Sequence, residues 1–184
     1  FLAIQKPGNF SQEKMGSYLG TSKGNIKNIL DLLEKTRLIF HIEPHIKSAK
    51  RQVKSWEYFF ASSSLKHALN LSIGNLNSDK NAYLGILLEN LVASRLFYLS
   101  NEYGSYFTLY YDPENKTNVD FIVQREFQKA IPVEVSMGKK DKKQISKAIE
   151  HYDADYGIII SNTKEKIEKE DNVIYISPQT FSYF

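Results

Sequence analysis

The chain contains no cysteine and only four histidines among its 184 residues. The absence of cysteine excludes disulfides, thiolate metal sites and cysteine nucleophiles, and it is compatible with a reducing cytoplasm. We therefore expect a cytoplasmic protein. Four histidines provide few ligands for a zinc site.

Several longer signals are also absent. No apolar run approaches the roughly 18 residues that cross a bilayer, and no charged-then-apolar leader opens the chain, so no membrane association is expected. The phosphate loop Gly-x-x-x-x-Gly-Lys-[Ser/Thr] occurs nowhere in the sequence, so this chain cannot bind and hydrolyse ATP in that manner. The chain begins at Phe1 without a Met, which suggests a fragment of something longer.

The residues that are present indicate a folded core. Hydrophobic residues make up 42% of the chain, including 12 Tyr and 11 Phe, and the length suits one ordinary domain or two small ones. Residues 1–58 hold ten Lys/Arg and five Asp/Glu, a net charge of +5, whereas residues 59–184 carry a net of −2. Because the first part of the chain is basic, we expect any nucleic-acid contact to be made there.

The first 60 residues predict a winged helix-turn-helix domain. Ser11 and Ser22 are each placed to cap a helix, and Gly20 ends the first one. The second helix carries an apolar i, i+3, i+4, i+7 stripe, and a short Gly-Thr-Ser turn joins the two helices. A strand at 38–42, a wing at 44–51 and a returning strand at 53–60 complete the pattern.

Residues 61–80 predict a connecting segment, and residues 81–184 predict a second domain. An apolar helix at 82–99 is followed by strands at 106–111, 118–123 and 130–136. A helix at 142–152 and strands at 157–160 and 173–176 follow. Because strand 157–160 is continuously apolar, we expect it to be buried and parallel. The fold class is therefore α/β (α+β over the whole chain) with a mixed sheet.

Two carboxylates are placed symmetrically about the hairpin of strands 118–123 and 130–136. If the hairpin folds about Phe127, Asp120 lies opposite Glu134, and directly opposed like charges are destabilising. A divalent cation, a partner lysine or a raised pKa would each account for the pair, and hard oxygen ligands suit Mg²⁺. A slipped register or a solvated sheet face are the structural alternatives.

The order of these segments resembles the PD-(D/E)XK nuclease-like fold, a restriction-endonuclease-like αβββαβ core that carries Glu, Asp and Glu-x-Lys. From about residue 10 onward the chain resembles the C-terminal half of prokaryotic AAA-type ATPases, in which a winged helix and a nuclease-like domain follow the ATPase core. The segments that carry this resemblance are Leu87–Val92, Tyr110–Tyr111 with Asn118–Phe121, and Ile131–Val135.

The resemblance implies that Glu89, Asp120 and Glu134 are the catalytic and metal-binding carboxylates, with Mg²⁺ as the cofactor. It also implies that ATP binds only to a domain outside this chain. The ATPase core of the same polypeptide would then be a partner of this region. Ser136 stands where the nuclease motif has Lys, which puts catalysis in doubt. Lys139 or Lys140 are substitutes for that missing cation, and Lys142 is a further one.

DNA is the other expected partner, through polar residues of the second helix and the wing: Ser22, Lys23, Asn25, Lys27, Lys50 and Arg51. The structural alternative is that these residues form an ordinary solvated face, and winged helices also serve as protein-contact modules.

Our leading hypothesis is an accessory region of an ATPase that associates with nucleic acid and has a degenerate nuclease-like domain. The alternatives are an active Mg²⁺-dependent DNA endonuclease or exonuclease, and a protein-interaction region without nucleic-acid binding. The sequence gives neither a base preference nor an oligomeric state.

Overall fold

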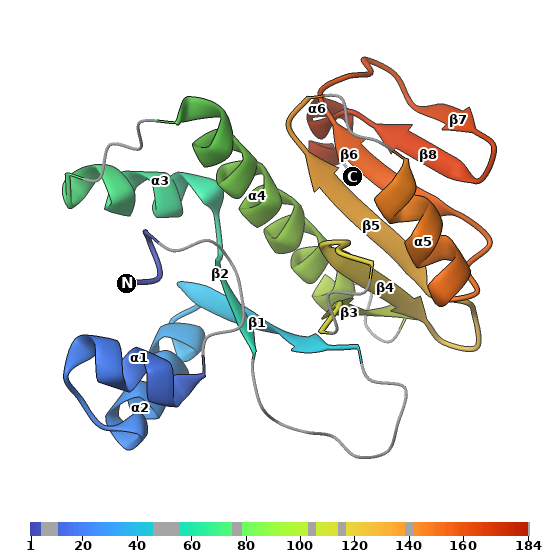
Figure 1. Cartoon of the computed structure of the whole chain (residues 1–184). Helices are drawn as coiled ribbons and strands as arrows, with labels where there is room; N and C mark the ends of the chain where they lie inside the picture. Colours follow the sequence, from blue (N-terminus) through green and yellow to red (C-terminus); the bar gives the residue numbers. More distant parts are fainter. Residues whose placement is uncertain are drawn as a thin grey trace.

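A computed structural model describes residues 1–4, 11–45, 56–74, 79–102, 106–113, 117–138 and 142–183. Within these ranges the fold is mixed α/β, with six helices and eight strands (Figure 1). The helices are α1 (Gln12–Leu19), α2 (Lys23–Lys35), α3 (Ser63–Ser72), α4 (Lys80–Glu102), α5 (Lys143–His151) and α6 (Pro178–Ser182). The strands are β1 (Ile39–Pro44), β2 (Glu57–Phe60), β3 (Phe107–Tyr111), β4 (Phe121–Arg125), β5 (Ile131–Ser136), β6 (Gly157–Ser161), β7 (Glu168–Glu170) and β8 (Val173–Ile176).

All eight strands join one mixed sheet in the order β2-β1-β3-β4-β5-β6-β8-β7. The pairs β1–β2, β3–β4, β4–β5 and β7–β8 are antiparallel, whereas β1–β3, β5–β6 and β6–β8 are parallel. The expectation that the 157–160 strand is buried and parallel is therefore confirmed. It pairs on both sides, and a strand in that position has to be apolar on both of its faces.

The first two helices form as their capping residues predict. The Ser11 hydroxyl accepts the backbone N–H of Lys14, and the Ser22 hydroxyl accepts that of Asn25, each at 3.2 Å. Gly20 ends α1 with a φ of 66°, a conformation that costs glycine little. A small core cluster beneath these helices contains Met15, Ile26, Leu30, Ile39 and Phe60. Most of the expected wing lies outside the described residues.

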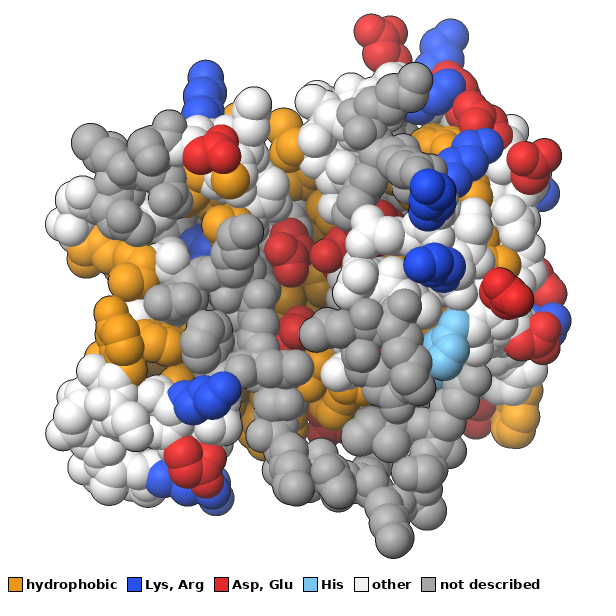
Figure 2. Space-filling model, viewed as in Figure 1, with side chains coloured by type: hydrophobic (Ala, Val, Ile, Leu, Met, Phe, Trp, Pro, Cys, Tyr) orange, Lys and Arg blue, Asp and Glu red, His pale blue; other side chains and the backbone are white. Residues whose placement is uncertain are grey.

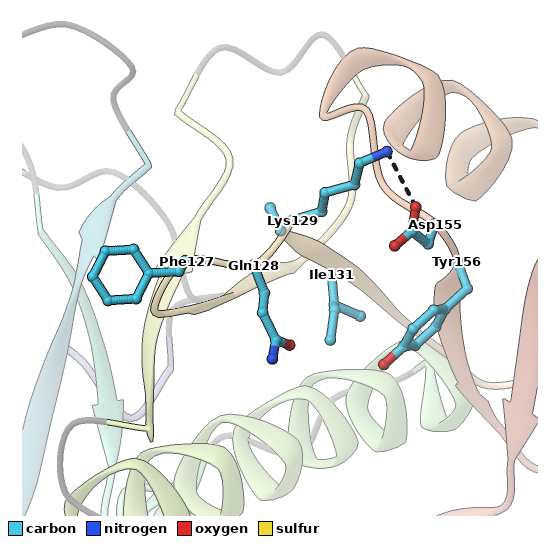
Figure 3. A pocket seen from close by; sticks show the side chains of 7 residues that line it. Phe127, Gln128, Lys129, Ile131, Asp155 and Tyr156 are labelled. Atoms are coloured by element: carbon cyan, nitrogen blue, oxygen red, sulfur yellow. Dashed lines mark ion pairs between the residues drawn. The ribbon is translucent and has the colours of Figure 1, made fainter.

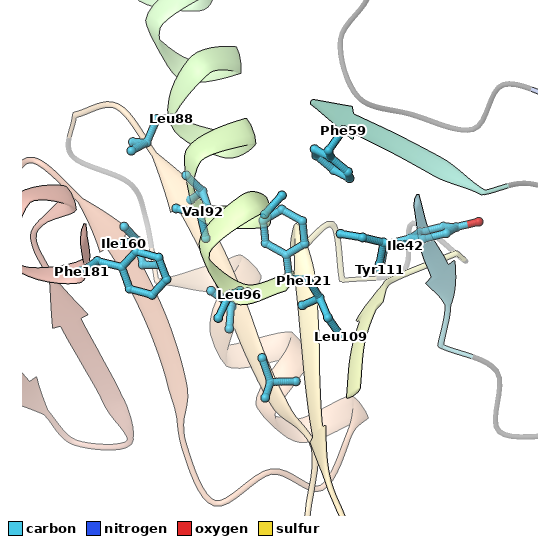
Figure 4. Close-up of a cluster of buried hydrophobic side chains, with 14 of the residues drawn as sticks. Ile42, Phe59, Leu88, Val92, Leu96, Leu109, Tyr111, Phe121, Ile160 and Phe181 are labelled. Atoms are coloured by element: carbon cyan, nitrogen blue, oxygen red, sulfur yellow. The ribbon is translucent and has the colours of Figure 1, made fainter. Parts of the chain in front are cut away.

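A larger core lies between α4 and the sheet (Figure 4). It includes Leu88, Val92 and Leu96 of α4, Phe121 of β4 and Phe181 of α6. Three residues of the first hairpin, Phe40, Ile42 and Phe59, belong to the same cluster. The rings of Phe59 and Phe121 lie 5.8 Å apart. The β1–β2 hairpin therefore packs on the same core as the rest of the sheet.

The opposite face of the sheet is covered by α5. Ile145, Ala148 and Ile149 of this helix pack with Ile122 and Ile159 of the sheet. Neighbouring residues on β4 and β5 alternate between the two faces, since Phe121, Val133 and Val135 belong to the α4 cluster. The sheet is thus covered by helices on both faces, as its apolar central strands require.

Helix α4 corrects one expectation from the sequence. It is 23 residues long with a mean hydropathy of 1.3 in its most apolar window, so its length and composition alone would suit a membrane span. Tyr, Ser and Asn residues interrupt the apolar run, but the mean hydropathy of the helix stays high enough for a membrane span. From Tyr83 to Ser100 every residue except Tyr98 is at least partly covered by the protein. In this structure Leu88, Val92, Ala93 and Leu96 of α4 pack in the core, and 28% of the apolar window is buried.

Candidate functional site

The β4–β5 hairpin folds in the register that its symmetry about Phe127 predicts. Phe121 pairs with Val133 and Ile122 with Pro132, and the same register places Asp120 opposite Glu134. Phe127 lies at the centre of the turn. β4 begins at Phe121 rather than at residue 118, because Asn118 has a φ of 55° and the chain bends before it enters the sheet.

The carboxylate of Asp120 is held by the backbone of β5. Its Oδ2 accepts the N–H of Val135 at 2.6 Å. This side-chain contact extends the hydrogen bonding between β4 and β5 by one residue, just before β4 begins. A hydrogen bond from an N–H to a carboxylate is stronger than one between neutral groups. Asp120 is therefore fixed in place rather than free to rotate.

Glu134 is almost completely buried, with 1% of its surface exposed. It pairs with Ile159 of β6, and alternation along β5 sets it apart from Val133 and Val135, which belong to the α4 cluster. Burying a carboxylate is costly unless polar partners or protonation compensate. A position this deep within β5 is unusual for a residue that serves only solubility.

A third carboxylate, Glu57, lies beside Asp120, and the sequence analysis missed it. Burial, together with the nearby charge of Asp120, raises the pKa of Glu57 to about 7. Glu57 belongs to β2, 63 positions before Asp120, on a strand assigned to the first domain. One signal was available: Glu57 precedes Phe59 by two residues, so it shares the face of β2 that packs on Phe121.

Glu89 faces a lysine that the sequence analysis did not consider. Lys66 of α3 is 3% exposed, and its Nζ donates to the backbone carbonyl of Leu2 at 3.1 Å. Burial lowers the pKa of Lys66 to about 8, while the charge of Glu89 opposes that shift. Glu89 is thus a counter-charge for a buried ammonium group. Figure 2 shows acidic side chains in the hollow of the face where α4 lies.

Asn90, next to Glu89, is fully buried and bonds both backbone groups of Phe60. Its Oδ1 accepts the Phe60 N–H, and its Nδ2 donates to the Phe60 carbonyl, each at 3.0 Å. The prediction that this residue bridges backbone groups is confirmed. Asn90 fastens α4 to the end of β2.

The position that the nuclease motif gives to lysine holds Ser136. Its hydroxyl donates to the carbonyl of Gly138 at 3.4 Å. Lys142, one of the expected substitutes, has its Nζ 2.8 Å from Glu170 and 3.9 Å from Asp171. The other two substitutes, Lys139 and Lys140, lie outside the described residues.

Within the described ranges, no group of three or more His, Asp and Glu side chains is arranged to hold a metal ion. Glu89, Asp120 and Glu134 all lie within those ranges. As the side chains stand, the residues present therefore do not fit a three-carboxylate Mg²⁺ site. What they do provide is a carboxylate pair, Glu57 and Asp120, of which one member has a pKa near neutrality.

The expected nucleic-acid residues of the second helix lie at the exposed start of α2. Lys23 forms an ion pair with Glu13 of α1, and the Asn25 amide donates to the Thr21 hydroxyl at 3.1 Å. Ser22 is the helix cap. Lys27 is exposed one turn further on, whereas Lys50 and Arg51 lie outside the described residues. Part of this polar face is thus engaged in holding the two helices together.

Two comparisons with known proteins bear on this site. Residues 84–181, just over half of the chain, match the family described as a domain of unknown function (DUF4143). The chain is also 34% identical over 175 residues to the uncharacterized protein MJ1637 of Methanocaldococcus jannaschii. That alignment covers 95% of this chain and 35% of the relative. The chain therefore spans about a third of the length of the curated relative that it matches.

Proposed function

Because the chain belongs to the DUF4143 family, we propose that it is an accessory region of a larger AAA-type ATPase, that it associates with DNA, and that its nuclease-like domain is degenerate. The observation that carries this proposal is the site itself. The register of the β4–β5 hairpin, continued by one residue, sets Asp120 against Glu134, and Ser136 stands where the nuclease motif has its lysine.

The association with an ATPase is supported by length and by family. The relative is almost three times as long as the region aligned with this chain, and DUF4143 domains are common in proteins associated with AAA-type ATPases. The chain has no phosphate loop. ATP binding would therefore belong to a segment outside it, and the ATPase core would be its partner in the same polypeptide.

The nuclease-like assignment is supported by the order of elements. From α4 to β6 the chain runs helix, three antiparallel strands, helix and a strand parallel to the third. This is the αβββαβ order expected of a restriction-endonuclease-like core. In such an enzyme, carboxylates hold the metal, and a lysine stabilises the developing charge. A serine cannot supply that charge, which favours a domain that binds or positions rather than cleaves.

The DNA association is assigned to the first part of the chain. α1, α2, β1 and β2 follow the order of a winged helix, and residues 1–58 carry a net charge of +5. Lys23 and Lys27 lie on the exposed start of α2. A helix in this position commonly enters the major groove, and surrounding basic residues contact phosphates.

DNA binding is tested by titration at several salt concentrations. We expect weak binding with a steep slope, since each neutralised phosphate contributes roughly −0.9 to the log–log slope on duplex DNA. Replacing Lys23, Lys27, Lys50 and Arg51 with Ala should flatten that slope. A control replaces four exposed lysines of the second part, Lys143, Lys147, Lys166 and Lys169. If both variants flatten the salt slope equally, the DNA contact is a general electrostatic attraction and is not located in residues 1–58. No binding at all would favour a protein-interaction region.

Cleavage is tested with a labelled oligonucleotide in Mg²⁺ or Mn²⁺, with and without EDTA. The wild type should cleave slowly or not at all. If the domain is a nuclease that lost only this lysine, Ser136→Lys should raise the rate from a low base, because a lysine there is two residues from Glu134 and on the same face. Asp120→Ala is the blank. Robust metal-dependent cleavage by the wild type that Asp120→Ala abolishes would instead identify an active nuclease, and Lys139 and Lys140 would be mutated next.

A further inference from the structure

Helix α3 turns polar side chains inward and apolar side chains outward. Lys66 and Asn70 are buried, at 3% and 2% exposure. Leu69 and Ile73, by contrast, are 39% and 57% exposed. The orientation of the helix is fixed by a specific contact, since the Lys66 Nζ donates to the carbonyl of Leu2 at 3.1 Å. The apolar residues are therefore exposed because of the way in which α3 packs on the rest of the chain.

The exposed apolar residues of α3 form a stripe on the side of the helix away from α4. Leu65, Leu69 and Ile73 follow one another at intervals of four residues, which places them on one side of a helix. Ser63 and His67 make the hydrogen bonds to α4, at 2.7 and 2.8 Å. Each is two residues from Leu65 and projects on roughly the opposite side. Leu65 packs against the small core beneath α1 and α2, and the other two residues extend the stripe beyond that core.

The hairpin tip of β4 and β5, on another part of the molecule, carries a pocket of about 290 Å³ lined by Phe127 to Ile131, Asp155 and Tyr156 (Figure 3). Its charged groups are already paired with one another, since the Nζ of Lys129 lies 3.1 Å from Asp155 and 3.3 Å from Asp153. The stripe on α3 has no such pairing to explain it.

The first residues of the chain join this stripe to α1. Phe1, Leu2 and Ala3 pack against the same small core as the stripe. The ring of Phe1 lies 4.9 Å from that of Tyr18, which is 64% exposed, and the next residue, Leu19, is 50% exposed. Figure 1 shows the amino terminus between α1 and α3, and Figure 2 shows hydrophobic side chains gathered there in the same view. Five residues form this amino-terminal apolar surface: Phe1, Tyr18, Leu19, Leu69 and Ile73. Exposed apolar residues that gather in this way mark interaction sites.

We propose that the amino-terminal apolar surface is covered by the part of the longer polypeptide that precedes Phe1, which packs an apolar helix face against it. This docking rests on the proposed function, in which an ATPase core precedes this region in the same polypeptide. The alignment covers 35% of the curated relative, so most of that protein lies outside it. A segment joined to Phe1 emerges at this surface and is held beside it by the chain itself.

The size and shape of the surface favour this occupant over a second copy of the chain. A stable complex between separate proteins takes roughly 20–30 residues from each partner, far more than this surface offers. A tethered segment needs less, because a short linker holds it at an effective concentration on the order of millimolar. The stripe on α3 forms a ridge with a spacing of four residues, and such a ridge packs into the groove of another helix.

The docking is tested by amide hydrogen exchange in residues 1–184 and in the full polypeptide that the same gene encodes. In the full polypeptide, the amides of α3 and of the end of α1 should exchange at least about tenfold more slowly, because packing raises the free energy of local opening. The amides of α5, which packs on the far face of the sheet, are the internal control and should exchange equally in both proteins. No slowing at α3 and α1, or equal slowing at α5, would overturn the proposal.

Two variants of α3 locate the contact. The double variant Leu69→Gln/Ile73→Gln should remove the slow exchange in the full polypeptide. It should leave the melting temperature of residues 1–184 nearly unchanged, because both side chains are already exposed there. The matched control is Leu71→Gln, since Leu71 is 50% exposed on roughly the opposite side of the same helix. Slow exchange that survives the double variant, or that the control variant also removes, would overturn the proposal.

Two further measurements separate this docking from its alternatives. Sedimentation of residues 1–184 should show a monomer, and a dimer that the double variant dissociates would identify a second copy as the occupant and overturn the proposal. ATP hydrolysis by the full polypeptide tests the proposed function by itself. Slow exchange at α3 and α1 without ATP hydrolysis would support the docking and contradict the ATPase assignment, whereas hydrolysis without slow exchange would do the reverse.

Discussion

At the scale of single residues, the protonation of Glu57 decides how the site behaves with pH. Burial and the neighbouring Asp120 raise the pKa of Glu57 from 4.5 to about 7. The folded state therefore holds this proton more tightly than the unfolded state does. The resulting stabilisation is complete below pH 4.5 and is lost as pH rises through about 7. The Asp120–Glu57 pair is then fully charged only in mildly alkaline solution.

Replacing Glu57 with Gln should remove this dependence. The variant and the wild type should be about equally stable at pH 5, and the variant should be more stable at pH 8 by up to about 3 kcal/mol, at 1.36 kcal/mol per pKa unit. Urea unfolding between pH 5 and 8 measures the difference. Glu43→Gln is the matched control, because Glu43 is an exposed carboxylate on β1. Parallel stability curves for wild type and Glu57→Gln would contradict the assigned pKa.

Asn90 should be among the most sensitive positions of α4. Asn90→Ala would leave the N–H and the carbonyl of Phe60 buried without their partner, and each such group costs about 1–3 kcal/mol. A loss on the order of 3 kcal/mol is expected in urea unfolding. Asn101→Ala, which removes an exposed amide bonded to the Phe97 carbonyl in the same helix, should cost less than about 1 kcal/mol. Similar losses for both variants would argue against the bridging role.

What the sequence could predict at this scale depended on local spacing. The register of the β4–β5 hairpin follows from its short turn, so counting from Phe127 sufficed. The partners of Glu89 and Asp120 could not be found by counting residues along the chain. Lys66 and Glu57 reach them through the packing of α3 on α4 and of β2 on the sheet, and such tertiary contacts leave no regular spacing in a sequence.

At the scale of elements, strong apolar periodicity made most helices and strands predictable, and its absence explains those that were missed. β7 is the tripeptide Glu-Lys-Glu at the edge of the sheet, with no apolar residue to mark it. α6 is five residues long and is defined by the Ser177 cap and Pro178 rather than by a stripe. The wing is a prediction that lies largely outside the described residues.

Two glycines in neighbouring helices offer a matched test of how α1 packs on α2. A Cβ at Gly16 would lie 2.7 Å from the Thr21 carbonyl oxygen, whereas a Cβ at Gly24 would lie 3.8 Å from its nearest neighbour. Gly24→Ala should stabilise by up to about 1 kcal/mol through helix propensity. Gly16→Ala should instead destabilise by about 1 kcal/mol or more, because backbone has to move. Thermal unfolding measures both, and equal gains would mean that α1 and α2 are not in close contact.

At the scale of the whole molecule, the sequence suggested two domains, and the structure adds a shared core between them. β1 pairs with β2 on one side and with β3 on the other. Phe59 of β2 is 1% exposed and packs in the same cluster as Leu88 of α4. Removing either part would expose this shared surface to water, at a cost that grows with the apolar area.

The chain should therefore unfold as one cooperative unit, and its single tryptophan allows this to be tested. Trp56 stacks on His41 at 3.8 Å beside the first hairpin, so its fluorescence reports on that part alone. Ile145→Ala removes a buried side chain of α5 on the far face of the sheet and should cost about 2–5 kcal/mol. We expect the fluorescence midpoint in urea to fall as far as the midpoint measured by far-UV circular dichroism. A fluorescence midpoint that stays in place while the dichroism midpoint falls would instead indicate two parts that unfold separately.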